Sequence, residues 1–165
     1  MNIKLSTFKS RLKHSAKFEA ETAGFLQNIE RELGCRVAFA ELDDYDCDLK
    51  LIFVQTGGSE GLFLENLGKL QEPYYLLTNG GNNSLAASME ILTYLNARGK
   101  QGEILHGSAS YVAQRIKLLA TVRSAKQKLS NCRLGVVGAP SDWLIASVPD
   151  YATVKQKLGV TLVDL

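Results

Sequence analysis

The stretch Leu49-Lys50-Leu51-Ile52-Phe53-Val54-Gln55 decides the fold. Its Leu-Ile-Phe-Val run is continuously apolar, which is typical of a strand buried on both faces of a parallel sheet. Two glycines follow the strand, and Ser59–Leu70 then has apolar residues at helical spacing. A second apolar strand is predicted at Tyr74–Thr78. A strand, a helix and a strand in this order predict a βαβ unit.

The same alternation continues in both directions from this unit. Toward the N-terminus it predicts a strand beginning at Ile3, a helix from about His14 to Leu33 and a strand at Arg36–Glu41. Toward the C-terminus it predicts helices or helical pieces at Ser84–Arg98, Ser108–Leu129, Trp143–Ser147 and Ala152–Leu158, and strands at Glu103–His106, Arg133–Gly138 and Val160–Leu165. We therefore predict an α/β fold: a doubly wound, mostly parallel sheet with helices on both faces, as in a flavodoxin-like three-layer sandwich, formed by residues 1–165 as a single domain.

Composition narrows the function classes. The 165 residues fit one domain, and a net charge of +2 gives no indication of nucleic-acid binding. No run approaches the roughly 20 apolar residues of a membrane span, and the N-terminus lacks the apolar segment of a signal peptide. Three widely spaced cysteines predict free thiols. We expect a cytoplasmic protein whose partners include neither nucleic acid nor membrane.

Three loops contain more glycine and small polar residues than a simple connection requires. They are Gln55–Gly61, which includes Thr56, Gly57 and Gly58; Thr78–Ser84, which includes Asn79, Gly80, Gly81, Asn82 and Asn83; and Gly138–Trp143, which includes Ser141, Asp142 and Trp143. Each loop follows a predicted strand, and ligands of open parallel sheets bind at the carboxyl ends of the strands. If neighbouring strands carry the loops, the three converge on one edge.

The residue types in these loops suit a hydroxylated or anionic ligand. Glycine lets the backbone approach a ligand closely, and asparagine and serine both donate and accept hydrogen bonds. Tight turns and helix caps at Ser59 and Ser84 explain the same residues. Trp143, the only tryptophan, has packing in the core as its default interpretation, with a pocket wall or a subunit contact as the alternative.

Several other kinds of site are poorly supported. The loops fit neither the dinucleotide-binding nor the P-loop motif. His106 ends a strand and could face the ligand edge, but one histidine without clustered carboxylates is not a metal site. The acidic stretch 43–48 lacks the glycine and the terminal glutamate of a calcium loop and is interpreted as a solvated connector.

Two stretches carry a resemblance to a known family. Leu77–Ser88 with Glu90-Ile91, and Gly135–Ile145, resemble the N-terminal region of L-fucose isomerase-like proteins, a family that includes the L-fucose and L-arabinose isomerases. The similarity runs in the same order from about Leu49 onward. The resemblance implies an aldose–ketose isomerase that moves a proton between adjacent sugar carbons, using a divalent metal, typically manganese, and paired carboxylates.

In that family the metal ligands and the carboxylates lie in a later, C-terminal domain. The resemblance therefore implies no catalytic and no metal-binding residue in this chain. It implies an N-terminal fragment of a longer chain, inactive alone, whose loops help to bind a small sugar and which assembles as a homo-oligomer. A chain that stops at the close of a predicted strand agrees with a fragment.

Two further interpretations compete with this one. The chain could be a self-contained binding module for a sugar or phosphosugar at the same loops. A receiver-like signalling domain would need aspartate at the end of a central strand, where this sequence has Gln55-Thr56 and Thr78-Asn79.

Overall fold

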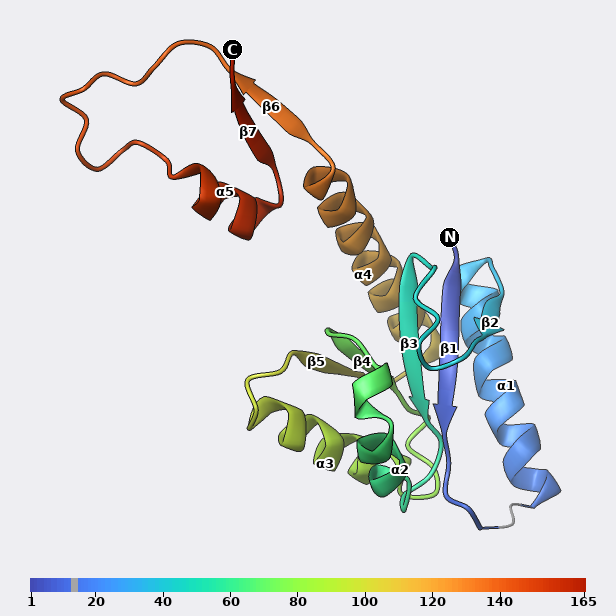
Figure 1. Ribbon diagram of the computed structural model, residues 1–165. Helices are drawn as coiled ribbons and strands as arrows, with labels where there is room; N and C mark the ends of the chain where they lie inside the picture. The colour runs from blue at the N-terminus through green and yellow to red at the C-terminus, as the bar shows by residue number, and fades with distance from the viewer. Residues whose placement is uncertain (13–14) are drawn as a thin grey trace. The chain divides into compact units, whose positions relative to one another are not determined.

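A computed structural model describes residues 1–12 and 15–165, so His14, at the predicted start of the first helix, lies outside the described residues. Two compact units are present, Met1–Ala120 and Thr121–Leu165 (Figure 1). The elements of the first unit are β1 (Ile3–Phe8), α1 (Ala16–Leu33), β2 (Val37–Phe39), β3 (Leu49–Val54), α2 (Glu60–Glu65) with a 3-10 turn at Leu67–Lys69, β4 (Tyr74–Leu77), α3 (Ser84–Asn96), β5 (Gly102–Leu105) and the part of α4 (Ala109–Ser130) up to Ala120. The second unit contains the end of α4, then β6 (Arg133–Val136), α5 (Tyr151–Leu158) and β7 (Thr161–Asp164).

The first unit is built on a five-stranded, all-parallel sheet. Its strand order is β2-β1-β3-β4-β5, which is the order of flavodoxin-like doubly wound folds. The predicted fold class is thereby confirmed. β3 lies at the centre, and all six of its residues are buried, as its apolar run predicted.

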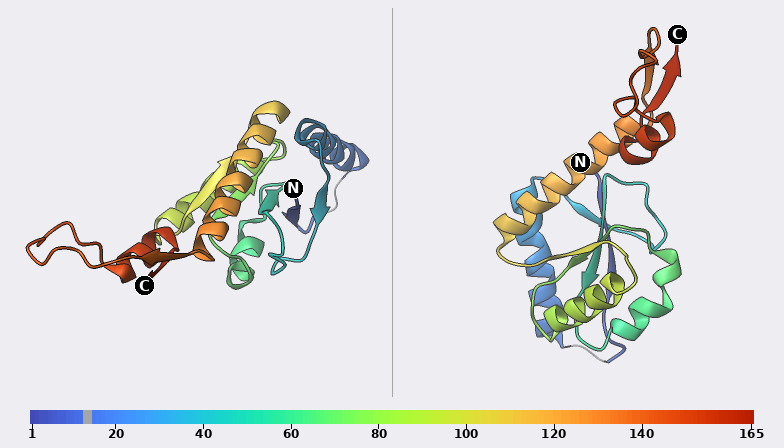
Figure 2. Two further views of the ribbon diagram at one scale, coloured as in Figure 1. Left: turned by 90° about the horizontal axis from the view of Figure 1, so that it is seen from above. Right: turned by 90° about the vertical axis from the view of Figure 1, so that its left-hand side faces the viewer.

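Two hydrophobic cores cover the two faces of this sheet. On one face, Leu49, Leu51 and Phe53 pack with Ile29 of α1 and Ile116 of α4. On the other face, residues of β3 and β4 pack with residues of α2 and α3; the buried members include Ile52, Val54, Leu76, Phe63 and Ile91. The alternation of β3 side chains between these cores makes three layers, which both figures show for this unit (Figures 1 and 2).

Helix α1 has strong sequence signals at both ends. The Ser15 hydroxyl accepts a hydrogen bond from the backbone N–H of Phe18, which is standard N-capping. Gly34 ends the helix with a φ of 74°, a left-handed conformation that glycine adopts without steric cost. These caps explain why the predicted C-terminal end of the helix agrees with the structure.

The connector between β2 and β3 contains no helical turn and is not simply solvated. Lys50 is buried at the amino end of β3 and donates hydrogen bonds to the carbonyl oxygens of Glu41 and Asp44. Burial lowers the pKa of Lys50. The Asp44 carboxylate forms an ion pair with Lys4 at 2.6 Å. The connector thus supplies the polar partners that a lysine in a buried strand requires.

The second unit has a sheet of its own, in which β6 pairs with β7 in parallel. The pattern predicted one sheet for all strands, whereas the strand after α4 does not return to β5. Helix α4 has 22 residues, about 33 Å at 1.5 Å per residue. That length is roughly twice the span of the short strands before it, so α4 is not a minimal crossover between neighbouring strands.

The helical piece predicted at Trp143–Ser147 is wrong, because the structure has turns and bends there. Pro140 and Pro149 flank the segment, and proline disfavours helix at the residue before it. Side chains here are exposed as well, including Ile145 at 98%. Cys35, Cys47 and Cys132 are free thiols, as predicted. No helix among the described residues is long and apolar enough to cross a membrane.

Candidate ligand-binding edge

Two of the three predicted loops meet at the carboxyl edge of the five-stranded sheet. The Gln55–Ser59 loop follows β3, and the Thr78–Asn83 loop follows β4, its neighbour in the sheet. The backbone N–H of Gly57 donates to the carbonyl oxygen of Asn82 at 2.8 Å. A Cβ at position 57 would lie only 2.9 Å from the Cβ of Asn83. The close approach therefore requires glycine, and it joins the two loops into one surface.

The loop after β4 is held by hydrogen bonds of its own side chains. The Thr78 hydroxyl donates to Ser84 Oγ at 2.7 Å and accepts from the backbone N–H of Gly80. Asn79 Oδ1 accepts from the N–H of Gly81 at 3.0 Å and from the Ser84 hydroxyl at 3.2 Å. Thr78 and Ser84 are fully buried, so these bonds position the loop and leave its exposed side chains for other partners.

Two consecutive residues of this loop have left-handed backbone geometry. Asn82 and Asn83 have φ values of 50° and 58°, a region that asparagine tolerates better than most residues. Asn83 is the N-cap residue of α3, yet its side chain makes no capping hydrogen bond. Both asparagines are exposed. Their amides, together with the NH2 group of Asn79, have no protein partner among the described residues and face no competing bond.

Thr56 differs from the other candidates because it is 5% exposed and already bonded. Its hydroxyl accepts from the backbone N–H of Ser10 at 2.8 Å, and its carbonyl accepts from Ser59. The Thr56 side chain therefore connects the loop after β1 to the loop after β3 and has a structural role. The sequence predicts Thr56 as a ligand contact, whereas its hydroxyl is buried and already bonded in the structure.

Gln55 stands out from the rest of the first loop. Its side chain is 7% exposed, and its Oε1 atom is buried without a hydrogen-bond partner in the described part of the chain. A buried acceptor without a donor costs about 1–3 kcal/mol, and such groups call for a functional explanation. The sequence placed Gln55 in a candidate loop but gave no signal that its amide would be unsatisfied.

A cavity of about 420 Å³ lies where the loops after β1 and β3 come together. Gly57 and Gly58 line it with Ser10, Arg11 and Leu12. β1 and β3 flank the point at which strand order reverses, the usual ligand position in such sheets. Sequence reasoning missed the β1 loop because it lacks glycine. The strand order, once known, identifies it.

His106 lies at the same edge, as predicted from its position after β5. A Cβ at Gly80 would be 2.7 Å from His106 Cε1, so the ring covers that glycine closely. Nδ1 lies 3.2 Å from the carbonyl oxygen of Thr78. Because a carbonyl oxygen can only accept, this contact is a hydrogen bond in the tautomer that carries a proton on Nδ1.

The third loop belongs to the second unit. Gly138–Trp143, with candidates Ser141, Asp142 and Trp143, follows β6 of the separate two-stranded sheet. The expected convergence required neighbouring strands of one sheet, and β6 is not a strand of the five-stranded sheet, so that condition is not met for this loop. Trp143 is 76% exposed, so its default interpretation as a core residue is wrong. Its exposure leaves the pocket-wall and subunit-contact interpretations open.

The electrostatics of the edge are close to neutral. Lys9 pairs with Glu19 at 3.1 Å, and Arg11 pairs with Glu65 at 3.3 Å. The remaining groups are amides, hydroxyls and the imidazole of His106. Within residues 1–12 and 15–165, no group of three or more histidine, cysteine, aspartate or glutamate side chains could hold a metal ion. The residues present therefore do not fit a divalent metal.

A scan against protein-family models gives no match for this chain, and a search of curated proteins gives none.

Proposed function

We propose that the first unit binds a small neutral sugar at the carboxyl edge of its sheet, as the N-terminal domain of an aldose–ketose isomerase similar to the L-fucose isomerase-like proteins. The observation that carries the proposal is the junction of Gly57 with Asn82 and Asn83, which makes one surface of two loops. Amides of Asn79, Asn82 and Asn83 donate and accept hydrogen bonds as vicinal hydroxyls require.

The charge of the edge favours a sugar over a phosphosugar. Within residues 1–12 and 15–165, the two cations near this edge, Lys9 and Arg11, already face carboxylates, so a phosphate that used them would have to displace Glu19 or Glu65. Among the described residues, this edge offers the uncapped N-terminus of α3 but no arginine that is free of a carboxylate, and arginine is the usual partner of a phosphate.

In this proposal the chain orients the sugar and contributes no proton transfer. Manganese and the paired carboxylates belong to the C-terminal domain that the resemblance implies, because the residues described here do not fit a metal. That domain and other copies of the chain are the proposed partners, and the cytoplasm is the proposed location.

An isomerase assay of the longer protein tests the proposal with L-fucose and L-arabinose, with and without manganese. We expect manganese-dependent ketose formation. The Asn82→Gly variant removes one amide but suits the left-handed backbone, so it should raise KM several-fold and leave kcat unchanged. Glu90→Gln, at an exposed site on α3, is the control. Absence of turnover in the unmodified protein, or an unchanged KM in Asn82→Gly, would contradict the proposal.

A self-contained binding module is the second candidate function. The cavity of about 420 Å³ at the β1–β3 switch point favours it, because all the residues that line this cavity lie within the first unit. Saturable sugar or phosphosugar binding to the 165-residue chain, with no turnover by any longer form, would select this function.

A further inference from the structure

The outer edge of β1 is left unpaired at its carboxyl end. Pairing of β1 with β2 covers Ile3–Leu5, whereas pairing with β3 continues to Phe8. The carbonyl of Leu5 accepts from the N–H of Ala40 on the β2 side, and that of Phe8 accepts from Gln55 on the β3 side. Because backbone groups alternate along a strand, the N–H and C=O of Thr7 point toward the β2 side. The described residues supply no strand opposite Thr7.

A side chain explains why β2 stops there. A parallel ladder that continued past Leu5 would use the carbonyl of Ala40 to accept the N–H of Thr7. The Ser6 hydroxyl instead donates to that carbonyl at 2.8 Å and also approaches the carbonyl of Glu41 at 3.2 Å. The chain after Ala40 then leaves the sheet toward Lys50. The absence of a β2 residue paired with Thr7, called here the Thr7 gap, therefore follows from the hydrogen bonds of Ser6.

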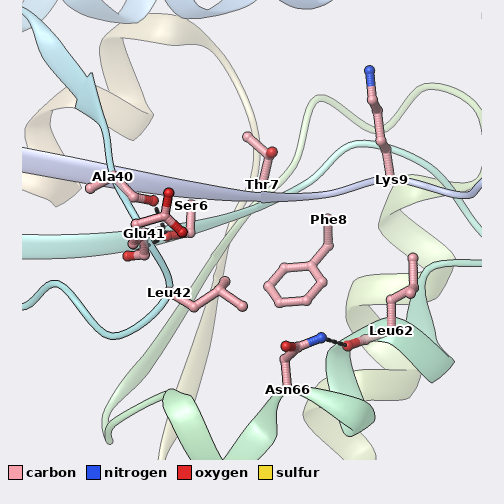
Figure 3. Close-up of a pocket in the computed structure, with 9 residues that line it drawn as sticks. All are labelled: Ser6, Thr7, Phe8, Lys9, Ala40, Glu41, Leu42, Leu62 and Asn66. Atoms are coloured by element: carbon pink, nitrogen blue, oxygen red, sulfur yellow. Dashed lines mark hydrogen bonds between the residues drawn. The ribbon is translucent and has the colours of Figure 1, made fainter.

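Two cavities adjoin this gap, and Thr7 lines both. The first, of about 350 Å³, has an apolar floor of Phe8, Leu42 and Leu62 (Figure 3). Figure 3 shows the side chain of Thr7 on the opposite side of β1 from that of Phe8. The second, of about 460 Å³, is lined by Leu5, Thr7 and Phe39 and by the carboxylates of Glu41 and Asp44.

The charge in this region is negative and partly uncompensated. Asp44 is paired with Lys4, but the exposed Glu41 carboxylate has no protein partner among the described residues. Lys9, on the rim of the first cavity, already pairs with Glu19. A group that enters beside Glu41 is therefore favoured when it is basic.

We propose that this edge binds an extended peptide of a partner protein, with an apolar side chain in the first cavity and a neighbouring basic side chain beside Glu41. Successive side chains of a strand point to opposite faces, so one extended segment fits both cavities while its backbone pairs with Thr7. The proposal does not rest on sugar binding, because the peptide pairs with the backbone groups of Thr7 that point toward the β2 side of β1.

The test uses the 15N-labelled 165-residue chain and an end-blocked nonapeptide that alternates valine and lysine. We expect saturable chemical-shift changes at Thr7, Lys9 and Leu42, and at least tenfold slower hydrogen exchange of the Thr7 amide at saturation. Two control peptides have the same composition: one groups the valines and lysines in blocks, and the other carries N-methyl groups on its backbone. Both should bind at least tenfold more weakly.

Reversing the charge at position 41 distinguishes specific peptide binding beside Glu41 from nonspecific electrostatic binding. Glu41→Lys should weaken the valine–lysine peptide by about fivefold, the upper range for an exposed ion pair, and should strengthen an alternating valine–glutamate peptide. Glu90→Lys makes the same charge change on α3 and should alter neither affinity. No saturable shift, equal binding of a control peptide, or an equal effect of Glu90→Lys would overturn the proposal. Tighter binding of a small planar molecule than of any peptide at Thr7 would also overturn the proposal.

Discussion

Replacing Gly57 by alanine places a methyl group between the two loops of the sugar-binding edge. The new Cβ would lie 2.9 Å from the Cβ of Asn83, whereas carbon atoms pack best at about 3.5–4.0 Å. Overpacking of this kind costs about 1–3 kcal/mol. The shift also weakens the Gly57–Asn82 hydrogen bond, a net contribution of about 0.5–1.5 kcal/mol. We expect Gly57→Ala to destabilise the first unit by about 2–3 kcal/mol.

Asn83→Gly provides the rescue. It removes the opposing Cβ, its φ of 58° suits glycine, and it sacrifices no capping bond. Alone it should raise stability by less than about 1 kcal/mol, because asparagine already tolerates this conformation. In the double variant, the nearest remaining backbone atom is the Asn83 carbonyl oxygen at 3.4 Å, an ordinary contact. The coupling energy should therefore be at least about 1 kcal/mol, whereas independent sites are additive within about 0.3–0.5 kcal/mol.

Hydrogen exchange of the slowest amides in β3 measures the unfolding free energy of the first unit, and urea unfolding followed by circular dichroism provides a second estimate. Gly24→Ala is the matched control: nothing lies within 4 Å of the new methyl in α1, so it should stabilise by about 0.5–1 kcal/mol. Additive effects of Gly57→Ala and Asn83→Gly would refute the reasoning that the two loops touch.

Three further predictions concern neighbouring groups. Gly80→Ala should lower the free energy of unfolding by about 1–2 kcal/mol because its φ is 78°. The new methyl would also clash with the His106 ring. His106→Ala removes this second contribution, which a double-mutant cycle measured by urea unfolding would show. The hydrogen bond from Lys4 lowers the pKa of Asp44 below its ordinary 3.8. The ionised carboxylate therefore stabilises the folded chain above pH 3.8, and this contribution should be lost as the pH falls through the lower pKa of the folded state. Acid unfolding of the Asp44→Asn variant should not show this loss. Gln55→Met removes a buried acceptor that has no hydrogen-bond partner among the described residues. It should raise the unfolding free energy by about 1 kcal/mol, measured by urea unfolding, and a lower stability would contradict this reasoning.

Local sequence signals predicted the first unit well. The apolar run of β3 and the caps of α1 act over a few residues, so their consequences can be read from the sequence itself. The approach of the loops after β3 and β4 followed from the parallel sheet, because neighbouring parallel strands end at the same edge. That reasoning placed Gly57, Asn82 and Asn83 together correctly.

The failures depend on which segments pair at a distance. Periodicity identified β6 and β7 as strands, but it carries no information on whether β6 joins β5 or β7. The 22 residues of α4 were the available signal, since they exceed what a short crossover needs. Trp143 was misplaced for the same reason, because its packing depends on the sheet that its loop follows.

The Ser10–Leu12 loop was missed because its part in the edge follows from strand order alone. A signal based on glycine content cannot find a loop that contributes through its neighbour. Buried and unsatisfied groups such as Gln55 Oε1 likewise emerge only from three-dimensional packing.

Titration of the 15N-labelled 165-residue chain with L-fucose and L-arabinose tests the central claim most directly. We predict saturable shifts of the Gly57, Gly80 and Asn82 amides and of the Asn79 and Asn83 side-chain NH2 groups, with weaker binding in Asn82→Gly. No saturable shift with either sugar, or shifts confined to residues away from these two loops, would contradict it.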